Sequence, residues 1–171
     1  MSDLVLQSIV VGLIAIISAL VGGVLPQWIQ NFENEKKLKR EKLETLYIDI
    51  ENWFNNAFNI FYLQFDLIFK GVIDWDGYSD ICIKQKPLGT HKKSEMTICL
   101  YFNELDEEYK QLLKSVTDIN KFINGEIRQA YIRGEDVNSF KALHQEKVDF
   151  SINNMKSLQD HIRNLAGSLS K

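Results

Sequence analysis

Hydrophobic residues follow two different patterns along this chain. From Leu4 to Phe32 there is no Asp, Glu, Lys or Arg, and only Asp3 of the 20 basic and 23 acidic residues precedes Glu33. From Asn34 onward the apolar residues recur every three or four positions, which is typical of amphipathic helices. The pattern therefore predicts an apolar N-terminal segment joined to a charged helical one.

The segment from Leu4 to Leu25 is long and apolar enough for one membrane span. Its 22 residues contain only three polar side chains, those of Gln7, Ser8 and Ser18. At ~1.5 Å per residue, a helix of this length crosses the ~30 Å hydrocarbon layer of a bilayer. We call residues 4–25 the predicted span.

The flanking residues favour an uncleaved anchor over the alternative, a secretory signal peptide. The chain begins Met1-Ser2-Asp3, whereas a signal peptide begins with positive charge. Trp28 lies where an interfacial aromatic anchor is expected. By the positive-inside rule, the cations that follow the span place the N-terminus outside and the rest of the chain in the cytoplasm. These cations are Lys36, Lys37, Lys39, Arg40 and Lys42.

Small residues occupy one face of the predicted span. Steps of three and four residues keep them aligned at ~100° per residue, and small side chains let membrane helices approach closely. We expect several copies of the chain to pack through this stripe, although the frequent Gly and Ala of membrane helices could produce it by chance. The stripe consists of Ser8, Gly12, Ala15, Ala19, Gly22 and Gly23.

Three long helices are predicted after the span. The first reaches Lys70, the second follows an N-cap at Ser94 and ends at Gly134, and the third begins near Asp136. Gly and Pro residues at about 71–93 predict an irregular loop there, within which a short helical turn and an edge strand are the alternatives for the segment VIDWDGYSDICIKQ.

The expected fold is therefore all-α. Residues 1–32 form a short outside N-terminus and a transmembrane helix, and residues 33–171 form a cytoplasmic antiparallel bundle of three long helices. The aromatic residues between Trp53 and Phe65 are interpreted as the core-facing stripe of the first long helix. The alternative is a surface between subunits, since aromatic residues are enriched at interface cores.

Candidate chemistry is sparse. The sequence has no phosphate-binding loop, nucleophile elbow, HExxH or CxxC motif. Asp74, Asp76 and Asp80 lack the distal Glu of a calcium loop, and two cysteines cannot form a disulfide framework. We expect no catalytic residue, no metal and no cofactor. The net charge of −3 and pI of about 5.6 argue against direct nucleic-acid binding.

The last helix contains Arg163-Asn164, which matches the start of the Arg-x(4–6)-His motif of HEPN-family ribonucleases. Ser168 occupies a position where that family has histidine, and no Arg of the chain is followed by His at the required distance. The departure implies that the chain does not cleave RNA by the family's route.

The whole layout resembles the pore-forming accessory membrane proteins of type VI-B CRISPR systems. The resemblance rests on the span, the Lys/Glu-rich segment EKKLKREKLETLY, the aromatic helix and the segment from Ser94 to Leu105. These proteins have one span and a divergent HEPN-like bundle. The resemblance implies a homo-oligomeric pore in the bacterial inner membrane that depolarises infected cells alongside an RNA-targeting CRISPR effector.

Three functional hypotheses follow. The first is this pore, whose partners are other copies of the chain and the lipid bilayer. The second is a membrane-tethered interaction module that recruits a cytosolic partner. The third is a degenerate HEPN-type ribonuclease that retains Arg163 and Asn164.

Overall fold

The computed structural model describes residues 15, 18, 20–85 and 90–169, and every regular element in them is helical. The predicted all-α class is therefore confirmed. The chain divides into two compact units, Met1–Glu41 and Lys42–Lys171. We call the second one the bundle unit.

The first unit contains a π-helix, η1 (Leu20–Val24), and the first turns of α2 (Leu25–Phe58). Most of the predicted span lies outside the described residues. Among the residues that are described, none of the helices combines the length and the apolar character needed to cross a membrane.

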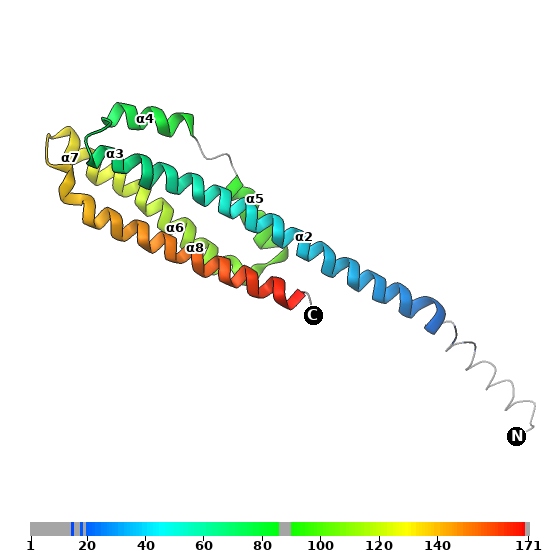
Figure 1. Cartoon of the computed structure of the whole chain (residues 1–171). Helices are drawn as coiled ribbons and strands as arrows, with labels where there is room; N and C mark the ends of the chain where they lie inside the picture. The colour runs from blue at the N-terminus through cyan, green and yellow to red at the C-terminus, as the bar shows by residue number, and fades with distance from the viewer. Residues whose placement is uncertain (1–14, 16–17, 19, 86–89, 170–171) are drawn as a thin grey trace, which may run out of the picture. The chain divides into compact units, whose positions relative to one another are not determined.

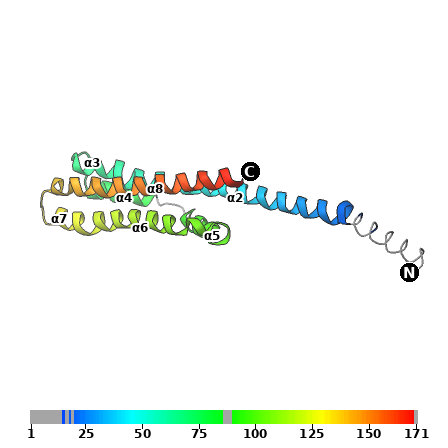
Figure 2. The same cartoon turned by 90° about the horizontal axis from the view of Figure 1, so that it is seen from below.

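The bundle unit contains three long helical stretches that lie side by side (Figures 1 and 2). In the first and second of them, a π-helical turn separates two α-helices. The elements are α2 with η2 (Asn59–Gln64) and α3 (Phe65–Phe69); α6 (Asp106–Phe122) with η4 (Ile123–Ile127) and α7 (Arg128–Ile132); and α8 (Lys141–Leu169), which follows the short 3-10 helix η5 (Val137–Phe140).

Apolar faces of these stretches meet in two buried clusters. One cluster joins the bundle-unit part of α2 to α5, α6 and α8, and includes Leu46, Tyr109 and Leu158. The other joins η2, α3, α4, η4 and the start of α8, and includes Phe65 and Ile123. The aromatic residues after Trp53 belong mainly to these clusters, as the core-facing interpretation predicts.

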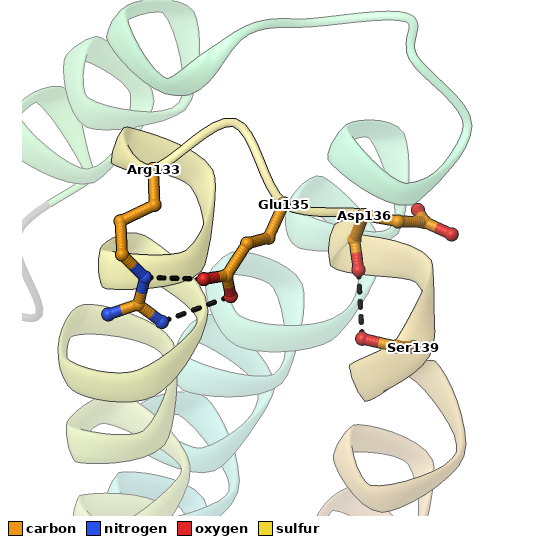
Figure 3. A network of polar contacts seen from close by, with 4 residues as sticks. All are labelled: Arg133, Glu135, Asp136 and Ser139. Carbon is orange, nitrogen blue, oxygen red and sulfur yellow. Dashed lines mark hydrogen bonds and ion pairs between the residues drawn. The ribbon is translucent and has the colours of Figure 1, made fainter.

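Two glycines end the first and second long stretches where the sequence predicts. Gly71 and Gly134 have φ values of 65° and 71°, a conformation that costs other residues about 1–2 kcal/mol. Each helix end carries the paired backbone hydrogen bonds of a Schellman motif. Arg133 and Glu135 form an ion pair on either side of Gly134, and the carbonyl of Asp136 accepts from Ser139 Oγ at 2.8 Å (Figure 3).

The predicted loop at about 71–93 contains α4 (Trp75–Lys84) and the start of α5 (Thr90–Tyr101). Of the two alternatives for this region, the helical one therefore holds, and an irregular loop over the whole range is wrong. The side chain of Asp74 caps α4 by accepting from the Gly77 amide at 2.9 Å. Trp75 and Tyr78 bury one face of α4. Three aspartates and a glycine interrupt the short amphipathic pattern, so the sequence alone does not decide between a helical turn and an edge strand.

The second predicted helix is also corrected. Ser94 is a buried residue inside α5 rather than its N-cap. The chain leaves the helix at Phe102, which has φ −142° and ψ 56°, and the 3-10 turn η3 (Asn103–Leu105) leads into α6. Phe102 and Leu105 are both buried, so this corner lets two apolar side chains reach the core.

Candidate functional site

The predicted small-residue stripe is only partly described. Ser8, Gly12 and Ala19 lie outside the described residues, whereas Ala15 is helical and exposed. Gly22 and Gly23 are exposed within η1, where an added Cβ atom would meet nothing within 4 Å. The exposed backbone at these two glycines leaves room for another helix to approach.

Trp28 stands at the start of a row of side chains on α2. Its ring stacks on Phe32 with centroids 6.1 Å apart, and Lys36 Nζ lies 4.9 Å from the Phe32 ring centroid. Steps of four residues place the three side chains one above another. An aromatic pair that ends in an ammonium group is suited to the boundary between an apolar phase and a charged one.

The cations after the predicted span have several roles. Lys39 pairs with Glu35 at 2.9 Å, and Lys42 Nζ lies 6.0 Å from the Tyr101 ring centroid. Lys37 and Arg40 are exposed. Because acidic residues are interleaved with these cations, they do not form a purely basic patch.

Arg163 and Asn164, the residues of the HEPN-like motif, are exposed on α8. Arg163 Nη1 donates to Asp160 Oδ1 at 2.8 Å. Hydrogen bonding to Tyr47 and the pair with Asp160 raise the pKa of Arg163. A guanidinium is charged at physiological pH without this shift. Ser168, where the family motif has histidine, donates to the carbonyl of Leu165 at 2.7 Å.

A groove that the sequence analysis missed runs between α2 and α8, beside Arg163. Gln159 Nε2 donates to the Tyr47 hydroxyl at 3.2 Å and links the two helices. The surface of the groove is mainly apolar, with a carboxylate and a guanidinium among its lining residues. These are Leu43, Glu44, Tyr47, Ile48, Ile162, Arg163 and Ala166. Only tertiary packing brings residues 43–48 beside residues 162–166.

The three histidines are dispersed through the bundle unit. The ring centroids of His91 and Trp53 lie 6.5 Å apart. His144 Nε2 lies 2.8 Å from the Phe61 carbonyl oxygen. His161 Nδ1 lies 3.0 Å from Glu108 Oε1. Each is occupied in joining elements of the bundle.

The cysteines also lie apart from these groups. Burial raises the pKa of the Cys82 thiol, which disfavours the reactive thiolate, and Cys99 is exposed on α5. Within the part of the chain that the structure describes, no three His, Cys, Asp or Glu side chains are grouped to hold a metal ion.

Within the described residues, two surfaces are candidates for binding a partner. These surfaces are the exposed start of α2 and the groove between α2 and α8. No protein-family model, curated protein sequence or solved structure matches this chain.

Proposed function

We propose that the protein is an inner-membrane protein whose copies assemble through their N-terminal spans into a pore. One observation carries the proposal: 29 consecutive residues without charge, from Leu4 to Phe32, adjoin a charged helical part of the chain. A water-exposed helix of this composition would be strongly unfavourable, whereas lipid accommodates it.

Orientation and assembly follow from the same segment. The cations after the span favour an outside N-terminus and a cytoplasmic bundle unit. The small residues at 8, 12, 15 and 19 favour close packing of spans. A ring of such spans encloses a channel lined by few polar groups, so its gate would be a hydrophobic constriction.

The resemblance in layout supports the biological setting of the proposal. In that setting the pore depolarises an infected bacterial cell and acts beside an RNA-targeting CRISPR effector. The pore itself needs no ribonuclease activity, which agrees with Ser168 at the histidine position of the HEPN motif.

A matched pair of substitutions tests the pore. Gly12→Leu enlarges the side chain at the predicted seam between spans, whereas Val10→Leu adds one methylene on the opposite, lipid-facing side. We expect Gly12→Leu to abolish both the large oligomer and ion permeability, and Val10→Leu to preserve both. The measurements are the mass of the detergent-solubilised protein and the potassium permeability of phosphatidylethanolamine/phosphatidylglycerol vesicles.

Two results would contradict the proposal. A wild-type mass corresponding to a monomer or dimer would exclude a channel, because one or two single spans cannot enclose one. Unchanged permeability in Gly12→Leu would show that the stripe is not the seam.

A second candidate function is favoured by the groove between α2 and α8. Its apolar surface, with Glu44 and Arg163 among the lining residues, suits an apolar segment of a cytosolic protein that carries charges of both signs. In this case the bundle unit would be a tethered interaction module, and the span would serve only as an anchor.

A further inference from the structure

Large apolar side chains on the first turns of α2 are uncovered. Leu25, Ile29 and Phe32 are 46%, 47% and 49% exposed, and Trp28 beside them is 66% exposed. Exposed apolar side chains in a continuous row mark a surface that binds something.

These residues belong to a seven-residue repeat that extends through α2. One series contains Ile29, Lys36, Leu43, Ile50 and Ala57, and a second contains Leu25, Phe32, Lys39, Leu46 and Trp53. In the bundle unit the members of both series, from Leu43 onward, are buried against other helices. The spacing that forms a helix–helix contact there is repeated at residues 25–32, where the described part of the chain provides no covering helix.

Only one side of this segment is apolar. Gln27, Gln30, Asn31 and Asn34 occupy the positions that the 3.6-residue period places away from Leu25 and Phe32. Lipid around a helix leaving the bilayer would meet all of its sides alike, so a bilayer does not account for a single apolar stripe. A second helix contacts one side only.

Charge complementarity favours another copy of the same chain as the occupant. We assign Ile29 and Lys36 to heptad position a. Position d is then occupied by Leu25, Phe32 and Lys39. In the same register Glu35 occupies position g and Arg40 occupies position e. In a parallel pair, g of one helix faces e of the following heptad on its partner. Glu35 of each copy then faces Arg40 of the other, while Lys39 binds Glu35 within its own chain at 2.9 Å.

We propose that Leu25, Ile29 and Phe32 form a parallel, coiled-coil-like contact between copies of this chain, directly after the predicted span. The apolar part spans about two helical turns, because Lys36 and Lys39 occupy the next core positions. Such a short contact does not hold two helices together in water. The inference therefore rests on the proposed assembly of spans, which brings the segments together.

Cysteine cross-linking of the full-length protein tests the contact. In a Cys99→Ser background, Leu25→Cys and Ile29→Cys place thiols in the proposed contact, and the matched controls Gln27→Cys and Asn34→Cys place them on the polar side. The proteins are oxidised with copper phenanthroline in phosphatidylethanolamine/phosphatidylglycerol vesicles. We expect disulfide-linked dimers to form several-fold faster at positions 25 and 29 than at 27 and 34.

Two other cross-linking results overturn the contact. Equal cross-linking rates on the apolar side and on the polar side of the helix show that copies of the chain collide without a specific contact. Protection of positions 25 and 29 from aqueous maleimide without cross-linking shows that the bilayer covers the stripe.

A cysteine in the span distinguishes failure of this contact from failure of the pore. If Ala15→Cys cross-links while positions 25 and 29 do not, the spans assemble and the contact is wrong. If positions 25 and 29 cross-link in a protein that gives vesicles no ion permeability, the contact stands and the pore is wrong.

Charge reversal tests the parallel orientation. Glu35→Arg alone removes both Glu35–Arg40 pairs of the contact and should reduce the cross-linking rate of Ile29→Cys by about tenfold, since each exposed ion pair is worth about threefold. Adding Arg40→Glu should restore the rate, because it recreates the pair with inverted signs. No recovery in the double variant overturns the assignment of Glu35 and Arg40 to facing positions.

Discussion

His144 shows how one buried residue can make the stability of the bundle unit depend on pH. Its side chain is buried beside Tyr62, Phe65 and Phe69. Nε2 carries a proton in this contact, because its partner 2.8 Å away is the Phe61 carbonyl oxygen, which can only accept. Burial lowers the pKa of His144, although the carbonyl and Asp66 both oppose this shift.

The direction of this shift predicts a loss of stability in mild acid. An unfolded His144 binds a proton more readily than the folded one, so protonation favours unfolding as the pH falls through about 6.5. Above that pH the residue contributes no pH dependence. We expect the thermal midpoint of the detergent-solubilised protein to fall between pH 7.5 and 5.5.

The variant His144→Gln isolates this contribution. Its amide can replace the donor to Phe61 but does not titrate, so the decline between pH 7.5 and 5.5 should become shallower. His161→Gln, which changes the half-exposed histidine beside Glu108, is the control for removing a histidine elsewhere. If His144→Gln retains the full wild-type decline, the assigned origin of the pH dependence is wrong.

At the scale of the element, helix ends and π-turns should respond oppositely to the same substitution. Gly134→Ala places a Cβ atom at φ 71° and should destabilise the protein by about 1 kcal/mol or more. Gly125→Ala lies in η4, where an added Cβ meets nothing within 4 Å, and should stabilise it by about 0.5–1 kcal/mol. Denaturant unfolding measures both free energies, and destabilisation by Gly125→Ala would contradict the helical role of that glycine.

Local sequence signals predicted the helix ends better than the corners. Gly71 and Gly134 were identified because positive φ favours one residue type strongly. The start of the last helical region near Asp136 was also predicted, and the structure shows that this side chain accepts from the Asn138 amide at 3.0 Å. The break at Phe102 was missed because no Gly or Pro causes it, and burial of Phe102 and Leu105 depends on distant helices.

The candidate surfaces also differ in whether local sequence or tertiary packing determines them. Trp28 and the cations after the predicted span were proposed from their order along the chain, and their roles stay predictions. The groove between α2 and α8 could not be predicted, because Tyr47 and Gln159 meet only after the bundle has formed. The seven-residue repeat predicts the apolar stripe at Leu25, Ile29 and Phe32. The absence of charge from Leu4 to Phe32 indicates contact with lipid, and the two signals overlap in these residues.

At the scale of the whole molecule, the polar contacts of the bundle unit are mainly structural. The Tyr109 hydroxyl donates to the His91 carbonyl at 2.7 Å. Lys93 pairs with Asp49 at 2.7 Å, and His161 binds Glu108. Two surfaces of the described residues lie outside these three contacts, namely the start of α2 and the groove beside Arg163. The proposed contact between copies uses the first of these surfaces, and the proposed tethered module uses the second.

Replacement of the predicted span separates a pore from a tether. Residues 4–20 are exchanged for a leucine-rich span of equal length, which leaves the stripe from Leu25 to Phe32 unchanged. A tether needs only an anchor and should keep its cellular function. A pore needs its own seam, so ion permeability in vesicles should be lost although the protein still resists carbonate extraction from membranes.

A second replacement serves as the matched control for the seam. It carries Ser8, Gly12, Ala15 and Ala19 on the same leucine-rich background and should recover the permeability, because these side chains restore close approach of the spans. If the leucine-rich span without them permeabilises vesicles as well as the wild type does, the small residues have no role in assembly. Loss of permeability with both replacements would instead assign the channel lining to the other side chains of residues 4–20.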